Sequence, residues 1–151
     1  MKINEKAPDF TLNDAGGNEW KLSEQRGKTV VLLFYPGDNT PVCTKQMCSV
    51  RDNWADYAAT DALVVGISTD SEASHRDFAE KHDLPLTLLS DANGEVSKLY
   101  DASSWIPGRS ARAVVVIDKT GIVRHHQVQS LSIFRPKDDE ILEAIRQSEK
   151  S

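Results

Sequence analysis

Residues 29–48 read TVVLLFYPGDNTPVCTKQMC, and this stretch decides the fold. The run 29–35 is almost wholly apolar and lacks the alternation of a half-exposed strand. That pattern is typical of a strand that is covered on both faces, as in an α/β sheet. Thr40 and Pro41 then suit the N-cap and the first position of a helix. The stretch therefore predicts a buried strand, a short loop and a helix that begins at residue 41.

The rest of the chain extends this pattern on both sides. Upstream, residues 9–28 alternate around Gly16-Gly17, which predicts an N-terminal hairpin. Downstream we expect a helix over 41–59, then strand 62–69, helix 71–82, strand 84–89, helix 95–100, strands 111–118 and 122–128, and helix 138–147. Pro85 makes strand 84–89 start late or lie at an edge. The tail 148–151 is expected to fray.

A βαβ unit followed by a ββα unit is the thioredoxin-like arrangement. We therefore expect an α/β protein with a mixed central sheet flanked by helices, and an N-terminal β-hairpin extension. The sequence contains no linker, repeat or low-complexity segment. A chain of this length is most simply one domain over residues 1–151.

Composition excludes several classes of function. The chain is 39% hydrophobic and 27% charged, which is typical of an ordered globular protein. A net charge of −5 without a lysine or arginine block argues against a nucleic-acid partner. The N-terminus lacks an apolar signal segment, and no apolar run is long enough to span a bilayer, so we expect no membrane association and a cytoplasmic protein. In that reducing compartment a cysteine pair is more often catalytic, redox-sensing or metal-binding than a permanent disulfide.

Cys43 would occupy the third position of the predicted helix. Unpaired backbone N–H groups and the helix dipole stabilise negative charge there, so the thiolate is favoured. Because the thiolate is the nucleophile, the local sequence predicts a reactive Cys43. Cys48 could equally be a small buried apolar residue without a role in the chemistry, and for this cysteine that is a serious alternative to a redox role. A zinc site needs about four ligands, and no histidine has ligand spacing to the cysteines, so we expect no metal and no cofactor.

The spacing of the two cysteines is unusual. Five residues along one helix place the two Cα atoms roughly 8–9 Å apart and on different faces. A disulfide needs Cα atoms within about 7 Å. Either Cys43 and Cys48 never bond, or bonding unwinds the first turns of the helix. The second option would couple chemistry to local unfolding.

The motif P-x-x-x-T-x-x-C, formed by Pro36, Thr40 and Cys43, resembles the active-site motif of the peroxiredoxins. The fuller stretch FYPGDNTPVCT, with a second cysteine five residues after the first, resembles the bacterioferritin-comigratory-protein or peroxiredoxin Q subfamily. KAPDFTL near the start and RAVVVID at 112–118 extend the resemblance over nearly the whole chain.

This resemblance implies a thiol peroxidase with an antioxidant role, acting on hydrogen peroxide and organic hydroperoxides. It makes Cys43 the peroxidatic cysteine and Cys48 the resolving cysteine, which would join in an intrachain disulfide. Thr40 would hold the peroxide and the thiolate through its hydroxyl, and Arg112 would supply positive charge. Thioredoxin or a similar dithiol would be the reductant, and the subfamily favours a monomer.

The resemblance also suggests substrate-binding roles for Pro36, Val42 and Gln46. Pro36 would shield the pocket from water, and the backbone at Val42 would donate to the peroxide. Val42 stands where glycine is frequent and Gln46 where glutamate is frequent. A glutamine retains hydrogen-bonding capacity without the charge. The segment 105–109, WIPGR, has no clear match, and we expect it to line the pocket or to form a plain surface loop.

Some alternatives remain open from the sequence. Arg51 and Arg109 compete with Arg112 as the source of positive charge. A thioredoxin-type oxidoreductase would need a C-x-x-C motif, and residue 46 is glutamine. A non-enzymatic redox sensor or binding module could use the same disulfide switch.

Overall fold

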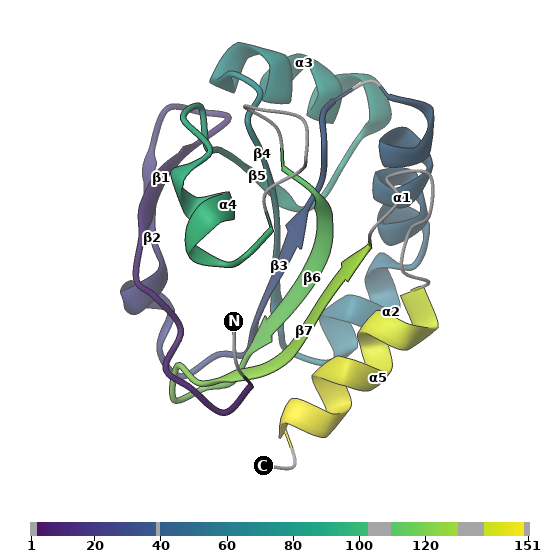
Figure 1. The fold of residues 1–151 in the computed structure, drawn as a ribbon. Helices are drawn as coiled ribbons and strands as arrows, with labels where there is room; N and C mark the ends of the chain where they lie inside the picture. Colours follow the sequence, from purple (N-terminus) through teal and green to yellow (C-terminus); the bar gives the residue numbers. More distant parts are fainter. Residues whose placement is uncertain (1–2, 39, 103–109, 130–137, 150–151) are drawn as a thin grey trace.

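A seven-stranded mixed sheet with helices on both faces forms the centre of the computed structural model (Figure 1). The structure describes residues 3–38, 40–102, 110–129 and 138–149, without the side chains at 41, 42 and 129. The strands are β1 (Thr11–Asp14), β2 (Glu19–Lys21), β3 (Val30–Phe34), β4 (Leu63–Ser68), β5 (Thr87–Ser90), β6 (Arg112–Ile117) and β7 (Val123–Gln129). Their spatial order is β2-β1-β5-β4-β3-β6-β7.

The sheet is mixed, as the sequence predicts, and β7 returns antiparallel to β6. β3 pairs in parallel with β4, and β4 with β5, while β6 and β7 return antiparallel on the other side of β3. The hairpin β1-β2 attaches to the sheet through antiparallel pairing of β1 with β5. The thioredoxin-like α/β fold with its N-terminal hairpin is thus confirmed.

The helices are α1 (Pro41–Asp52), α2 (Trp54–Ala59), α3 (Glu72–His82), α4 (Glu95–Leu99) and α5 (Asp138–Glu149), with a 3₁₀ turn η1 (Leu22–Gln25). The single helix predicted over 41–59 is divided at Asn53. This residue has φ −105° and ψ 17°, and its side-chain amide donates to the Ser49 carbonyl at 2.8 Å. The backbone N–H of Asn53 also bonds to this carbonyl, and asparagine is a weak helix former whose side chain favours helix ends.

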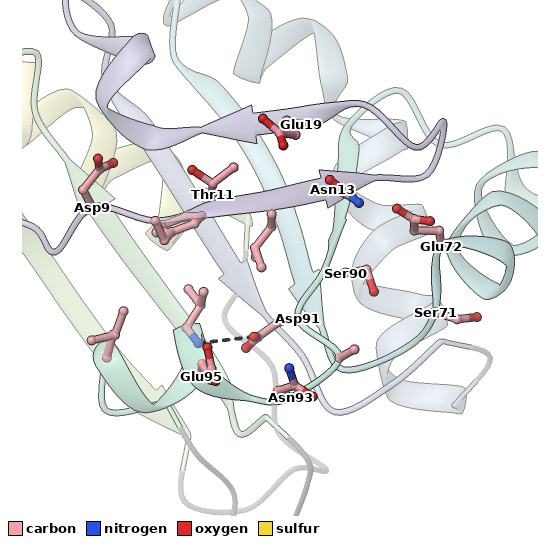
Figure 2. Close-up of a pocket in the computed structure, with 15 residues that line it drawn as sticks. Asp9, Thr11, Asn13, Glu19, Ser71, Glu72, Ser90, Asp91, Asn93 and Glu95 are labelled. Carbon is pink, nitrogen blue, oxygen red and sulfur yellow. Dashed lines mark hydrogen bonds between the residues drawn. The ribbon is translucent and has the colours of Figure 1, made fainter.

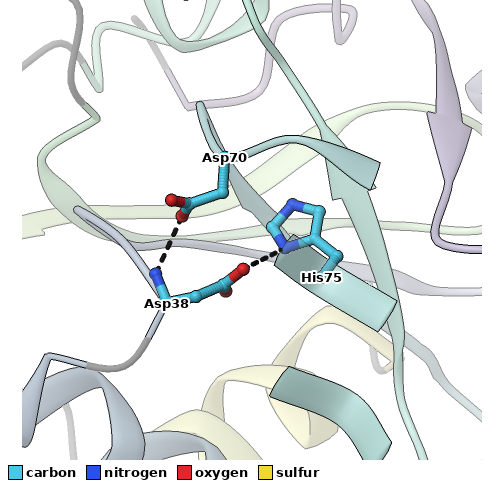
Figure 3. A group of neighbouring side chains, drawn as sticks. All are labelled: Asp38, Asp70 and His75. Carbon is cyan, nitrogen blue, oxygen red and sulfur yellow. Dashed lines mark hydrogen bonds and ion pairs between the residues drawn. The ribbon is translucent and has the colours of Figure 1, made fainter. Parts of the chain in front are cut away.

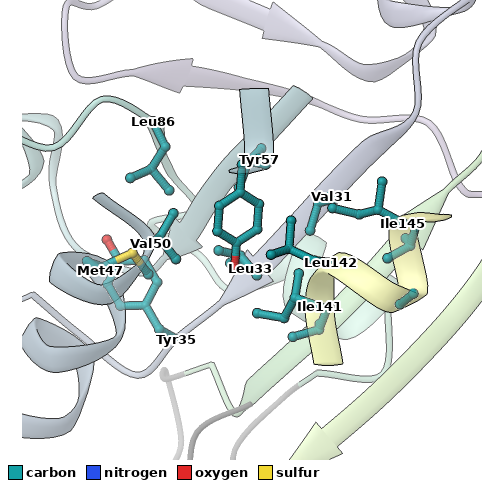
Figure 4. Close-up of a cluster of buried hydrophobic side chains, with 14 of the residues drawn as sticks. Val31, Leu33, Tyr35, Met47, Val50, Tyr57, Leu86, Ile141, Leu142 and Ile145 are labelled. Carbon is teal, nitrogen blue, oxygen red and sulfur yellow. The ribbon is translucent and has the colours of Figure 1, made fainter. Parts of the chain in front are cut away.

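Successive residues of β3 face two different cores, and every residue of this strand is buried. Val31 and Leu33 face a core built with α1, α2, α3 and α5 (Figure 4). Val30 and Leu32 face a second core, to which α4, the N-terminal segment and η1 contribute. Coverage on both faces explains why the run 29–35 shows no polar alternation.

Three smaller expectations can be compared with the structure. The helix predicted from residue 71 begins at Glu72, and Ser71 caps it by accepting from the Ser74 amide at 3.1 Å. The strand after Pro85 does start late, at Thr87, and it lies between β4 and β1. The tail does not fray at residue 148, because Ser148 is buried and its hydroxyl donates to the Ile145 carbonyl.

Within the described part of the chain, no helix combines the length and apolar character needed to cross a membrane.

Candidate active site

The pairing of β3 with β6 brings Arg112 to the start of α1. The two strands are antiparallel, and Phe34 at the end of β3 pairs with Ala113 near the start of β6. Arg112 therefore lies where β3 gives way to the loop 36–40 and α1. It is two residues from Val114, which faces the core under α1, so the two-residue period of a strand directs both side chains to the same face.

At this place Arg112 joins two residues of α1. One guanidinium nitrogen, Nη2, lies 3.0 Å from the Sγ of Cys43, and the other, Nη1, donates to the Oε1 of Gln46 at 2.5 Å. All three residues are at most 1% exposed. A guanidinium N–H thus points at the buried sulfur, in a site where attraction between opposite charges is strong because water is excluded. The amide nitrogen of Gln46 is buried and has no partner among the described residues.

Thr40 occupies the N-cap position of α1 with an extended backbone, as predicted, yet its side chain does not cap the helix. Its hydroxyl instead donates to the Gly37 carbonyl at 3.2 Å. Cys43, in the first turn, is fully buried. The Thr40 hydroxyl therefore accepts no hydrogen bond from the first-turn amides of α1, and N–H groups at a helix start suit a negative charge.

Cys48 lies on the same helix as Cys43, and both thiols are free. Cys48 is half-buried, whereas Cys43 is fully buried. With α1 intact, five residues of helix separate the two side chains onto different faces. The geometry is that of a reduced pair which must rearrange before it can bond.

The C-terminal end of α1 is tied to α5 by one carboxylate. Asp138, the first residue of α5, accepts hydrogen bonds from Ser49 and, at 3.3 Å, from Asn53. Its other oxygen accepts from the Tyr57 hydroxyl of α2 at 2.6 Å. Three donors from the α1–α2 region thus meet one acidic residue. We refer to Asp138 with Ser49, Asn53 and Tyr57 as the Asp138 clamp.

A polar cluster beneath the loop 36–40 was not expected from the sequence. Asp38 pairs with His75 of α3 at 2.8 Å, and both side chains are at most 1% exposed. Burial alone would raise the pKa of Asp38, but hydrogen bonds from His75 and Tyr35 and the charge of His75 hold this pKa below its ordinary value. Burial and the neighbouring Asp38 raise the pKa of Tyr35 well above its usual range, so its hydroxyl stays protonated as a donor.

The other predicted site residues are placed as follows. Pro36 is half-buried beside this loop, while the side chain of Val42 and the segment 105–109 lie outside the described residues. Arg51 donates to Asp52 at 3.0 Å and to the His82 carbonyl at 2.7 Å, so it is directed away from Cys43. Of the rival arginines that the structure describes, only Arg112 contacts the thiol.

A separate groove of about 760 Å³ lies between β1, the loop after β5 and α4 (Figure 2). Its lining includes Asp9, Glu19, Glu72, Asp91 and Glu95, and none of the site residues predicted from the sequence. Both carboxylate oxygens of Asp91 accept from backbone amides at the start of α4, so this side chain serves to hold the helix. The groove is therefore distinct from the thiol site.

Comparison with known proteins agrees with this geometry. The AhpC/TSA family model matches residues 3–126. Chloroplastic peroxiredoxin Q of Triticum aestivum is 47% identical over 122 residues, which cover 78% of this chain and 55% of the relative. The Arabidopsis thaliana relative of the same name is 46% identical over 129 residues, covering 82% and 58%.

Solved structures give the same result. The chain superposes on peroxidoxin BcpB of Mycobacterium tuberculosis with a TM-score of 0.86 and 33% identity, covering 97% of each chain. The reduced 2-Cys peroxiredoxin of Plasmodium vivax gives a TM-score of 0.90 and 28% identity, covering 99% of this chain and 84% of the other. A thiol at a helix start beside a buried arginine, on this fold, defines the peroxiredoxin class.

The chain belongs to the AhpC/TSA family and, within it, to the peroxiredoxins of the bacterioferritin-comigratory-protein or Q type. It spans just over half the length of the curated relatives that it matches. Those relatives are chloroplastic proteins, which overturns the expectation of a cytoplasmic protein. That expectation was drawn from the absence of a leader, and a chain that covers only part of its relatives carries no such information.

Proposed function

We propose that this chain is a thiol peroxidase that reduces hydrogen peroxide and organic hydroperoxides, with an antioxidant role. One observation carries the proposal: the buried Sγ of Cys43 lies in the first turn of α1, 3.0 Å from the guanidinium of Arg112. This arrangement holds a thiolate ready and places two kinds of donor, guanidinium N–H and helix amides, around it.

In the first step the thiolate of Cys43 attacks one peroxide oxygen. An S–O bond forms as the O–O bond breaks, and the second oxygen leaves with the electron pair. It takes up a proton and departs as water or an alcohol. Arg112 stabilises the charge that moves from sulfur to this leaving oxygen. Thr40, whose hydroxyl lies in the loop before α1, aligns the peroxide with the sulfur.

Gln46 and Pro36 support this step in the proposal. Gln46 accepts from Arg112 and so fixes the plane of the guanidinium. Its buried amide nitrogen then remains a donor for the peroxide oxygen. Pro36 limits the access of water, and the backbone amide at Val42 adds a further donor.

The second step joins Cys43 to Cys48. The sulfenic acid on Cys43 is attacked by the Cys48 sulfur, which forms the disulfide and releases water. Because an intact α1 keeps the two thiols apart, this step requires the first turns of α1 to unwind. Formation of the disulfide also consumes the sulfenic acid before a second peroxide can oxidise it to the sulfinic acid.

An external dithiol must then reduce the disulfide, and we propose thioredoxin or a similar protein for this role. The family supports this choice. We further propose that residues 1–151 act as one domain and as a monomer, without a nucleic-acid partner. The net charge of −5 supports the last point. Light scattering on the reduced protein tests the monomer directly.

The test of the peroxidase proposal mixes fully reduced protein with one equivalent of hydrogen peroxide under anaerobic conditions. Stopped flow follows peroxide loss, and intact mass and a free-thiol count follow. We expect rapid loss of peroxide, no free thiol and a mass lower by two hydrogens. Slow loss with both thiols still free would leave the redox sensor or binding module as the better account. The Cys43→Ser variant should consume no peroxide, since it lacks the nucleophile.

A further inference from the structure

The cluster beneath the loop 36–40 is a closed set of hydrogen bonds. Asp38 accepts at Oδ1 from the Tyr35 hydroxyl at 2.7 Å, and at Oδ2 from the Ser74 hydroxyl at 2.8 Å. His75 Nδ1 also lies 2.8 Å from this Oδ2. These partners come from two segments: Tyr35 follows the end of β3, and Ser74 and His75 lie in α3. Both oxygens of Asp38 are therefore fully engaged.

The surroundings of His75 determine its protonation. Its Nδ1 faces the Asp38 carboxylate, and its Nε2 lies 3.0 Å from the Leu89 carbonyl. A carbonyl accepts only, and so does an ionised carboxylate. Both contacts are satisfied when each ring nitrogen donates a hydrogen, which is the arrangement of an imidazolium paired with a carboxylate. The Tyr35 hydroxyl and the Asp70 carboxylate are the other polar groups close to it.

The same cluster holds the backbone of the loop. The Asp38 amide donates to Asp70 Oδ2 at 2.8 Å (Figure 3). Asp70 also accepts from the Ser68 hydroxyl at 2.6 Å. Asp38 is thus tied through its side chain to α3 and through its backbone to the residues after β4. Thr40, two residues further on, bonds to the Gly37 carbonyl next to Asp38. The position of the Thr40 hydroxyl therefore depends on this anchor.

We propose that Asp38 and His75 are positioning residues for the peroxide reaction, and that their buried ion pair fixes residues 36–38, Thr40 and the start of α1 relative to Arg112. This proposal rests on the proposed function. The pair touches neither peroxide nor sulfur. It acts by holding Thr40 and the first turn of α1, on which alignment of the peroxide depends.

A metal ion is the competing explanation for this cluster. Asp38, Asp70 and His75 offer ligand atoms within 4.8 Å of one another. A metal on Nδ1 would require loss of its hydrogen, and it would displace the donors that already occupy Asp38. Because existing hydrogen bonds satisfy these atoms, the ion pair accounts for the cluster better.

The first test records the ring nitrogens of the four histidines by ¹⁵N NMR in the reduced full chain at neutral pH. Assignment uses the His75→Gln variant. We expect both His75 nitrogens to be protonated in the wild type, and one to lose its hydrogen in Asp38→Asn. A neutral His75 in the wild type would overturn the ion pair. This result does not depend on any peroxidase activity.

The second test compares two reactions of Cys43 in Asp38→Asn, His75→Gln and the double variant. The control is Asp77→Asn, which changes an exposed aspartate on α3, the helix that carries His75. We expect the peroxide rate constant to fall about 10- to 100-fold, while alkylation by iodoacetamide does not fall, because only the peroxide needs alignment. The peroxide rate constant of the double variant should fall no further than that of a single variant, because each change alone already removes the same ion pair.

Each other result is decisive. Equal losses in both reactions would indicate a purely structural role and overturn the proposal, as would an unchanged peroxide rate. A chelator-sensitive rise in Tm with Zn²⁺, abolished in Asp38→Asn, would replace the ion pair with a metal site. A wild type that does not react with peroxide would refute the proposed function, while the NMR result would still decide the ion pair.

Discussion

The guanidinium of Arg112 lies 3.0 Å from the Sγ of Cys43, although 69 positions separate the two residues in the chain. The antiparallel register of β3 and β6 produces this contact, since it places the start of one strand beside the end of the other. The same guanidinium binds Gln46 through its second nitrogen. A planar group with two separate donors is therefore required at this place, which leads to the first prediction.

Arg112→Lys should lower the rate constant for peroxide by about 10²–10³, the usual loss for one donor to a developing oxyanion. A lysine keeps the charge but cannot bond to Cys43 and Gln46 together in this fixed geometry. Stopped flow with reduced protein measures the rate. Arg124→Lys, which alters an arginine paired with Asp118 instead, is the matched control. A wild-type rate in Arg112→Lys would refute the role given to the guanidinium.

Gln46→Glu should raise the free energy of unfolding by about 1 kcal/mol, because it removes a buried donor without a described partner. The new carboxylate would also pair with Arg112, which Gln46 already contacts. Gln46→Ala should have the opposite effect and lower the peroxide rate, since Arg112 loses its orienting acceptor. Urea unfolding of both variants measures the change. A less stable Gln46→Glu would contradict this prediction.

Cys48→Ser should leave the first peroxide attack intact and prevent turnover with a dithiol reductant. The sulfur of Cys43 does not need Cys48 for the first step, but the disulfide does. After one equivalent of peroxide, intact mass should show one added oxygen instead of the loss of two hydrogens. Full thioredoxin-coupled turnover in this variant would show that Cys48 is not the resolving cysteine.

Asp138→Asn should speed formation of the disulfide after the first oxidation and lower the stability of the protein. The Asp138 clamp holds the end of α1 through Ser49 and Asn53, and a hydrogen bond to a charged group contributes about 1.5–3 kcal/mol. Asp139→Asn changes the exposed neighbouring residue and is the control. Quenched samples analysed by mass give the disulfide rate. Lower stability with an unchanged disulfide rate would mean that the clamp does not restrain α1.

Asp118→Asn should lower stability at neutral pH by about 1–2 kcal/mol, given 1.36 kcal/mol for each pKa unit. Burial opposes the charge, yet hydrogen bonds from Thr120, Arg124 and Ile122 hold the pKa of Asp118 to about 2. A carboxyl whose pKa is lower in the folded than in the unfolded state stabilises the fold at any pH above its unfolded-state pKa. This stabilisation is lost as the pH falls through the folded-state pKa. The difference between variant and wild type should therefore vanish from about pH 4 to pH 2. Denaturation curves at several pH values test this, and a constant difference would contradict it.

Part of the fold and of the candidate site could be predicted from local pattern. The apolar run 29–35 and the Thr40-Pro41 pair defined a buried strand and a helix start, and the structure contains both. The contact of Arg112 with Cys43 needed the register of two distant strands, which the sequence supported only through a family resemblance. Local pattern alone left Arg51 and Arg109 as equal candidates.

Other features had no local signal. Asp38 and His75 are 37 positions apart, and neither spacing nor composition links a loop aspartate to a histidine inside α3. The break at Asn53 was also missed, because apolar residues recur at helical spacing on both sides of it. At Asn53 the side-chain amide bonds to the Ser49 carbonyl and to Asp138. The helix ends there because of these contacts, one of which comes from a distant part of the chain. Burial and long-range contacts thus determine the Asp38–His75 pair and the helix break at Asn53, and sequence periodicity carries no information on either.

The interruption at Asn53 has a consequence for the energetics of catalysis. Both cysteines lie within α1, and α2 is a separate short helix with its own buried anchor, Tyr57. Melting of the twelve-residue helix α1 can therefore stop at residue 53 while the sheet, α2 and α5 remain folded. In the proposed function, each redox cycle then includes a local order–disorder transition confined to α1. Asn53 and the Asp138 clamp, none of whose residues takes part in the chemistry, would then set the equilibrium constant of this transition.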